Sequence, residues 1–410
     1  MSGPHLHRLA NGFTIVVEPM AGVETLALGL HVDCGARHEE ARANGLAHLF
    51  EHMVFKGAGG RSAREISEAV ENVGGYLNAF TSRDQTAFQA RLLAEDLDLG
   101  VELIADLVRK PHFDAGDLAR EKDVVLQELG EARDLPDDII NDHFHSTAWP
   151  GQAFGRPVLG NEDTIAAITV DDLRGWTRKH YRPQAMVLAA AGKIDVGQFV
   201  SLAEAHFGDM EPAPPPGAEL ASYEGGQFVE RRRLESAHIL FGYEGVGYFD
   251  ADYYPLMLFS QAAGEGSSSR LFQAVREDRG LAYSVGSSVA AWRDTGMLTV
   301  YLATARREAQ HAADLSRDIL RDSAATLSPA ELARAKAQIR ATILMTLESV
   351  QGRADRLGFQ TLVHGAPLDP AAIIARIEAC TLDQVRAVGA RLLAGRETFA
   401  TVGPALKAAA

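Results

Sequence analysis

Short apolar runs alternate with longer amphipathic stretches along this chain of 410 residues. The runs at 13–17 and 186–190 are rich in residues typical of buried strands. Between 95 and 107, apolar residues recur at helical spacing, which predicts an amphipathic helix. Strands and helices mixed in this way favour an α+β fold over a doubly wound sheet. No glycine-rich phosphate loop follows a strand, so a nucleotide-binding fold of that type is not expected.

The regular pattern is interrupted near the middle of the chain. Residues 208–226 contain four Pro and four Gly with little apolar periodicity, which is typical of a linker. A chain of this length also exceeds what one ordinary hydrophobic core holds. We therefore expect two domains, at 1–210 and 227–410, joined by a Pro/Gly-rich linker at 211–226.

The two halves also resemble each other. The segment 117–122, DLAREK, is echoed at 331–336 by ELARAK, an offset of 214 residues. The segment 169–174, TVDDLR, is echoed at 381–386 by TLDQVR, an offset of 212. Two echoes at nearly one spacing indicate an internal duplication, so we expect the two domains to be homologous.

Composition and charge narrow the possible functions. The chain has 46% apolar and 23% charged residues, as globular proteins do, and a formal charge of -15 argues against nucleic acid as a partner. An acidic interior would attract basic peptides, although solubility alone also explains the charge. Cys34 and Cys380 are too few for a disulfide framework. No signal peptide or membrane span is recognisable, so we expect a cytoplasmic protein without membrane contact, the alternative being a mature form whose signal was removed.

One short helix carries the most informative residues. The segment 45–53 reads as a helix that follows a breaker pair, Asn-Gly. Residues four apart share a helix face, so His48 and His52 can present ring nitrogens to one metal ion. Glu51 lies near that face and could act as the base that activates an attacking water. On this pentapeptide alone, an ordinary surface helix with His and Glu remains an alternative.

The order H-x-x-E-H is the inverted zinc-peptidase motif. With the rest of the chain it resembles the pitrilysin or insulinase family, especially its short bacterial members and the mitochondrial processing peptidase, over nearly all 410 residues. The resemblance implies the metallohydrolase fold of that processing peptidase, with two α/β-roll domains. It also implies a third zinc ligand about 76 residues after His52, and Glu128 matches that position. Glu121 matches the acidic residue that supports the ligands from outside.

The second half serves as an internal control. At an offset of 214, Glu128 falls on Thr342 and Glu121 falls on Ala335, and no His pair is present. We therefore expect one Zn²⁺ per chain. The resemblance gives the second half another role, because Arg276 and Tyr283 match residues that reach into the family's active site. Tyr283 could donate to the oxyanion and Arg276 could hold a substrate carbonyl or the tyrosine itself, the alternative being an ordinary turn with a core tyrosine.

Further matches concern substrate binding. Asn78, Ala79 and Phe80 match the family strand that pairs with bound peptide through main-chain hydrogen bonds. Phe55 matches an apolar residue that lines the pocket for the side chain after the scissile bond, and a core Phe is the alternative.

Two acidic residues follow Glu128. Asp138 and Asp142 match positions that receive an arginine near the cleavage point in the processing peptidase. Their spacing of four equally describes an ordinary acidic helix face.

These features lead to one expectation and one rival. We expect a zinc metalloendopeptidase that hydrolyses peptides or unfolded segments of proteins. The family's long members contain two such halves, so we expect this chain to form a homodimer or to pair with a homologous subunit. The rival is a non-catalytic subunit or scaffold of a peptidase complex. Such subunits typically lack part of the zinc set, whereas all three ligands and the base are present here.

Overall fold

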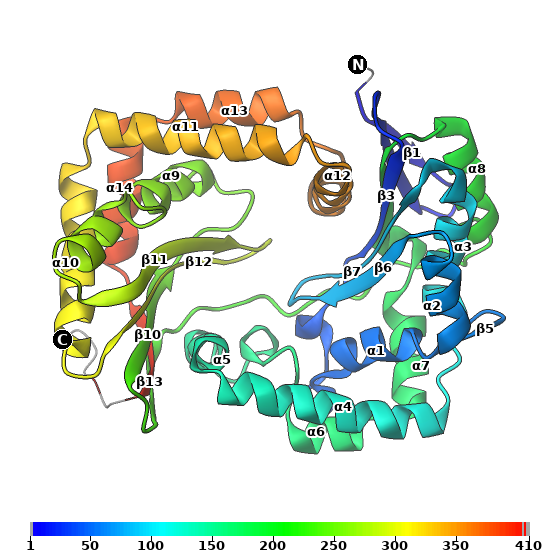
Figure 1. Cartoon of the computed structure of the whole chain (residues 1–410), viewed down its shortest axis with the longest axis horizontal. Helices are drawn as coiled ribbons and strands as arrows, with labels where there is room; N and C mark the ends of the chain where they lie inside the picture. The colour runs from blue at the N-terminus through cyan, green and yellow to red at the C-terminus, as the bar shows by residue number, and fades with distance from the viewer. Residues whose placement is uncertain (1–2, 404–405, 407–410) are drawn as a thin grey trace. The chain divides into compact units, whose positions relative to one another are not determined.

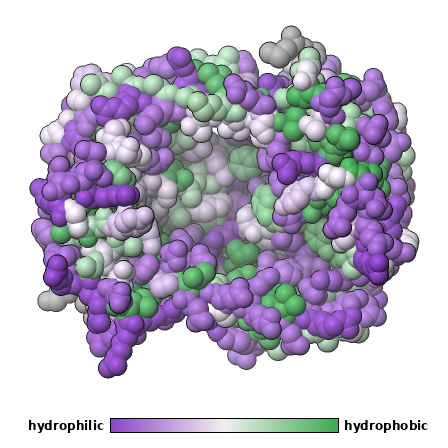
Figure 2. Space-filling view, viewed as in Figure 1, coloured by the Kyte–Doolittle hydropathy of each residue, from purple (hydrophilic) through white to green (hydrophobic). Residues whose placement is uncertain are grey.

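A computed structural model describes residues 3–403 and 406 of the chain (Figure 1). Their contacts divide them into two compact units. Of the described residues, the first unit comprises 3–129, 157–219 and 344–368, and the second comprises 130–156, 220–343, 369–403 and 406. Hydrophilic residues dominate the periphery of the face shown in Figure 2. Within the described ranges, every helix is too short or too polar to span a bilayer.

The first unit is built on a six-stranded sheet with the order β1-β2-β8-β3-β7-β6. All pairs are antiparallel except β2 with β8. The central strand β8 is buried at every position, which explains why its sequence is continuously apolar instead of alternating. Strand β6 pairs only with β7 and forms one edge of the sheet. The strands are β1 (His5–Arg8), β2 (Thr14–Pro19), β3 (Thr25–Val32), β6 (Tyr76–Thr81), β7 (Thr86–Leu93) and β8 (Met186–Gly192).

Helices cover both faces of this sheet. Most of them enclose the main core, in which Phe13, Phe50 and Phe88 are fully buried. Helix α12 packs on the opposite face, against β2, β3 and β8. A small hairpin of β4 (Gly57–Ala58) and β5 (Arg61–Ser62) follows the first helix. The helices are α1 (Leu46–Val54), α2 (Ala63–Glu71), α3 (Leu97–Arg109), α4 (Ala115–Asp134), α6 (Glu162–Ala167), α7 (Val170–His180), α8 (Val196–Phe207) and α12 (Val350–His364).

The second unit repeats this design with a five-stranded sheet of order β11-β12-β10-β13-β9. Its single parallel pair, β9 with β13, matches β2 with β8, and the remaining pairs are antiparallel in both sheets. This common topology confirms two homologous α+β domains. The strands are β9 (Gly226–Arg231), β10 (Ser236–Glu244), β11 (Ala282–Ala291), β12 (Gly296–Ala305) and β13 (Glu397–Gly403). The helices are α5 (Pro136–Ala148), α9 (Tyr253–Ala263), η6 (Phe272–Glu277), α10 (Ala309–Thr326), α11 (Pro329–Thr346), α13 (Pro370–Ala379) and α14 (Leu382–Leu393).

The units are not continuous in sequence, which differs from the division at 1–210 and 227–410. Each half of the chain gives one helix to the other unit's sheet. Helix α5 packs on β9, β10 and β13, while α12 packs on the first sheet. The segment between Phe207 and Gly226 contains no helix or strand, as expected of a linker.

Helix α12 contacts the first sheet through small residues and ion pairs. Gly358 lies directly over the buried ring of His31 on β3, where an added Cβ would come within 2.1 Å of His31 Cδ2. Glu18 on β2 accepts hydrogen bonds from Arg353 and Arg356 of the helix. Removal of the Glu18 carboxylate would leave two largely buried guanidinium groups without this partner, which is strongly destabilising.

Candidate active site

The helix that carries the motif, α1, is fixed at its N-terminus by a buried carboxylate. Glu39 is 4% exposed, and it accepts hydrogen bonds from the main-chain N–H groups of Gly45 (2.9 Å) and Ala47 (2.7 Å). The Asn44 side chain donates to the same carboxylate at 2.8 Å. A negative charge at this end also interacts favourably with the helix dipole. Gly45 has φ of 94°, a left-handed conformation that suits glycine at this entry to the helix.

Helix α1 and helix α4 bring the three predicted ligands together. His52 Nε2 lies 3.5 Å from Glu128 Oε2, and His48 Nε2 lies 3.8 Å from the same atom. One donor atom from each residue falls within 4.8 Å of the other two. Two imidazoles and a carboxylate are a donor set that zinc accepts, and three protein ligands leave a position open. The residues present therefore fit a catalytic zinc ion, and no other such group occurs among the described residues.

A second layer orients His52. Its Nδ1 lies 3.2 Å from Glu121 Oε2, a contact that favours the tautomer in which Nδ1 donates to the carboxylate and Nε2 keeps its lone pair for a metal. Glu121 is 6% exposed, and its other oxygen pairs with Lys56 Nζ at 2.8 Å. An ion pair of this kind offsets part of the cost of burying a carboxylate. This arrangement keeps the ring in the orientation that metal binding requires.

The protonation states also suit a metal site. Burial, helped by the neighbouring His52, lowers the pKa of His48 to about 4, so this ring is neutral at pH 7. Burial raises the pKa of Glu51, and a contact with Thr81 opposes this effect. Glu51 Oε2 is buried without a hydrogen-bond partner among the described residues. An acceptor of this kind, beside the ligands, is available to take a proton from water.

The sheet edge beside the site is β6, which carries the predicted peptide-binding residues. Asn78 and Phe80 are exposed, whereas Ala79 is 8% exposed and belongs to the core. Phe55, which follows α1, is partly buried against the same core. An outer strand leaves its unpaired main-chain groups available to an incoming strand.

The remaining predicted residues lie on the second unit. Arg276 is in η6, and its guanidinium carbon lies 5.0 Å from the ring centroid of Tyr283 on β11. Tyr283 is 84% exposed, which excludes a core tyrosine. Asp138 and Asp142 lie on α5, where Asp138 is exposed and Asp142 is half-buried.

The duplicated positions explain why the described part of the second unit lacks a metal cluster. Thr342 and Ala335 lie on α11, the counterpart of α4, where the first unit has its two glutamates. Thr342 is exposed and Ala335 is buried in the second core.

Sequence reasoning missed two residues of the site. Lys56 stands four residues after His52, just beyond the end of α1, so its short distance from the motif in sequence could have indicated it. Glu39 gave no such signal, because it lies in an irregular segment and its role depends on how that segment folds back to α1.

Comparisons with known proteins agree with this geometry. Residues 14–162 match the family described as insulinase (peptidase family M16), and residues 167–339 match the peptidase M16 inactive domain. A protein of Bacillus subtilis named uncharacterized zinc protease YmxG is 33% identical over 96% of this chain and 97% of its own length. The uncharacterized zinc protease Rv2782c of Mycobacterium tuberculosis is 34% identical over 98% of this chain and 93% of its own.

Two solved structures show the same fold at 20% identity, each covering 98% of this chain. One is described as a peptidase M16 inactive domain from Pseudomonas fluorescens, with a TM-score of 0.90 and 98% of that chain covered. The other is a protease from Helicobacter pylori, with a TM-score of 0.89 and 99% of that chain covered. The full-length matches and the two domain matches lead to one conclusion: this chain belongs to the insulinase family of peptidases, family M16.

Proposed function

We propose that this protein is a zinc-dependent endopeptidase that cleaves peptides or unfolded protein segments. The observation that carries the proposal is the convergence of His48, His52 and Glu128 beside the unbonded carboxylate oxygen of Glu51. The zinc-protease names of relatives that match over the whole chain support it.

His48, His52 and Glu128 would hold the zinc. When bound, zinc supplies a Lewis acid that acidifies water and polarises a peptide carbonyl. Glu51 takes the proton of the attacking water and passes it to the departing amine, as a general base and then a general acid. Burial favours this cycle, because it raises the pKa of Glu51 and so makes the carboxylate a better proton acceptor.

The substrate would bind along β6 as an added strand. Main-chain hydrogen bonds at an edge strand accept almost any extended segment, which suits peptides without fixed structure. Phe55 would line the pocket for the residue after the scissile bond. Asp138 and Asp142 would favour a basic residue near the cleavage site, and equal cleavage of Arg-containing and Arg-free members of a peptide library would contradict that preference.

Arg276 and Tyr283 would complete the active site from a partner subunit. This proposal assumes a dimer, either of identical chains or with a homologous subunit, and a closed two-fold dimer would use both sites equally. Mixing a Glu51→Gln chain with a Tyr283→Phe chain should restore activity, because one site of the mixed dimer would contain both intact residues. No recovery after verified subunit exchange would show that the tyrosine does not act in trans.

The metal assignment is tested by elemental analysis. The purified protein should contain one zinc per chain, and His52→Ala should lose it while keeping the fold by circular dichroism. Stoichiometric zinc in His52→Ala would contradict the assignment. Stoichiometric zinc in the wild type, with no cleavage of any unstructured peptide, would instead favour the non-catalytic alternative.

A further inference from the structure

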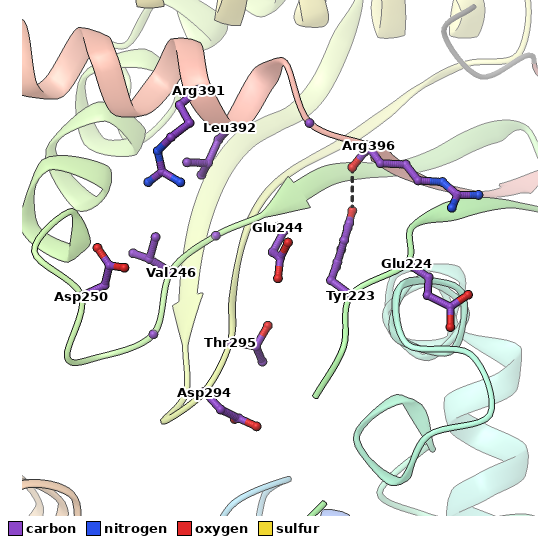
Figure 3. A pocket seen from close by; sticks show the side chains of 13 residues that line it. Tyr223, Glu224, Glu244, Val246, Asp250, Asp294, Thr295, Arg391, Leu392 and Arg396 are labelled. Carbon is purple, nitrogen blue, oxygen red and sulfur yellow. Dashed lines mark hydrogen bonds between the residues drawn. The ribbon is translucent and has the colours of Figure 1, made fainter. Parts of the chain in front are cut away.

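A cavity of about 630 Å³ lies at one end of the second sheet (Figure 3). Its wall is formed by the end of β10, the turn between β11 and β12, and the end of α14. Pockets for small ligands usually have volumes of this order. All lining residues belong to the second unit, whereas the zinc ligands belong to the first.

The charges around the cavity favour a cation. Arg391 already pairs with Asp252 at 2.7 Å, and Figure 3 shows the Arg396 side chain extending away from Glu244. The lining has four carboxylates and two guanidinium groups. The carboxylates are Glu224, Glu244, Asp250 and Asp294, and the guanidinium groups are those of Arg391 and Arg396.

One lining group is buried without a bonding partner, and one lining carboxylate, the exposed Glu244, faces no cation within the described part of the chain. Thr295 is 3% exposed, and its Oγ1 is buried without a hydrogen-bond partner among the described residues. Partial burial raises the pKa of Glu244, and no neighbouring cation offsets this effect. Figure 3 shows the two side chains one above the other in the cavity. A buried hydroxyl without a partner costs free energy, which a ligand could recover.

The cavity differs from the metal site of the first unit. Within the described residues, a search for three convergent metal donors finds only the first-unit cluster. The carboxylates of the cavity therefore form no three-donor metal cluster, and they suit a planar group with several N–H donors.

The first unit shows what such a turn can bind. The turns 82–85 and 292–295 connect equivalent strands, and each is closed by a hydrogen bond from its first N–H to its last carbonyl (2.8 and 2.9 Å). The N–H of Ala36 donates to the first carbonyl of one turn at 3.0 Å, and the N–H of Tyr248 donates to that of the other at 2.9 Å. These matching bonds show that Ala36 in the first unit and Tyr248 in the second occupy equivalent positions.

The residue after Ala36 in the first unit differs in type from the residue after Tyr248 in the second. In the first unit it is Arg37, which is 5% exposed and binds Asp84 of the turn at 2.9 Å and the Glu219 carbonyl at 2.6 Å. In the second unit it is Phe249, which is 60% exposed, while the aspartate is kept as Asp294. The fold thus binds an internal guanidinium at one turn and has an acidic cavity at the other.

We propose that this cavity binds an arginine side chain of another polypeptide. Its guanidinium would contact Glu244, Thr295 and Asp294, much as Arg37 contacts Asp84 in the first unit. A guanidinium fits better than an ammonium, because its planar array of donors can reach a carboxylate and a hydroxyl together.

The test uses the full-length, zinc-free protein, so that the probe is not cleaved. A fluorescein-labelled peptide Gly-Ser-Arg-Ser-Gly is titrated by fluorescence anisotropy beside the same peptide with citrulline, which keeps the shape and removes the charge. We expect saturable binding of the arginine peptide and at least about tenfold weaker binding of the citrulline peptide. Equal affinity for the two peptides, or no saturable binding in the millimolar range, would overturn the proposal.

Variants then place the binding at the cavity. Glu244→Gln should weaken the arginine peptide about tenfold, while Glu235→Gln, an exposed carboxylate of the same unit, should leave its affinity unchanged. Thr295→Val should weaken binding without lowering the melting temperature, because it removes a hydroxyl that has no partner in the free protein. If Glu244→Gln binds the arginine peptide as tightly as the wild type does, the peptide binds elsewhere and the proposal fails.

Discussion

Gly358→Ala tests the contact by which the second half of the chain completes the first unit. The new Cβ would lie 2.1 Å from His31 Cδ2 and 2.3 Å from Nε2. Ordinary contacts of this kind exceed about 3.4 Å, so the helix or the ring must move by about 1 Å. His31 is 1% exposed, which leaves its ring little room to turn.

Two opposing effects set the magnitude. Replacing a helical Gly by Ala gains about 1 kcal/mol of helix propensity. Forcing an extra methyl group into a packed contact costs about 1–3 kcal/mol. We expect the steric cost to exceed the gain, so that Gly358→Ala destabilises the protein. Gly175→Ala on α7 is the matched control, because its Cβ would meet nothing within 4 Å and only the gain applies.

Differential scanning calorimetry measures the difference in melting temperature between the two variants. In a unit of about 200 residues, 1 kcal/mol shifts the melting temperature by about 2–4 °C. Gly175→Ala should raise it and Gly358→Ala should lower it, with faster hydrogen exchange in residues 350–364. Adding His31→Ala to Gly358→Ala should recover much of the steric loss. Equal stabilisation by the two alanine substitutions would refute the packing of α12 on β3.

Further predictions concern charge and metal affinity. Burial lowers the pKa of His31 to about 4 from an ordinary value near 6.5, so folding favours the neutral ring. The contribution of His31 to the free energy of unfolding is fully present above pH 6.5 and is lost as the pH falls towards 4, by about 3 kcal/mol in all. Denaturant titrations at different pH values should show that His31→Leu lacks this part of the acid sensitivity. Glu39→Ala leaves two buried N–H groups of α1 without their acceptor, and should cost about 2 kcal/mol in unfolding free energy and weaken zinc binding in a chelator competition assay. Glu121→Gln should lower zinc affinity about 10- to 100-fold in the same assay, and an unchanged affinity would contradict its support of His52.

The motif helix and the strands could be predicted because their signals are local. Spacing along α1 predicted that His48 and His52 share a face, and the structure places their rings 4.7 Å apart. The apolar runs became β2 and β8, and the amphipathic run became α3. Glu128 was found through its distance from His52 in a known family, which no local pattern supplies.

The rest depends on contacts between residues far apart in the sequence. Nothing in the apolar pattern of α12 distinguishes the first sheet from the second, so its assignment to the first unit was missed. Its partners are found only after β2, β3 and β8 have been assembled into one surface. The cavity beside Glu244 is equally non-local, because its wall combines the end of β10, the turn between β11 and β12, and the end of α14.

Turnover by Glu51→Gln tests the central proposal most directly. The amide keeps the size of the side chain but cannot take a proton, so the variant should retain one zinc per chain by elemental analysis. Its kcat on a quenched fluorescent peptide should fall by about 10²- to 10⁴-fold against the zinc-loaded wild type. Near-normal cleavage by zinc-loaded Glu51→Gln, with contaminating protease excluded by an inactive His52→Ala preparation, would show that Glu51 is not the base.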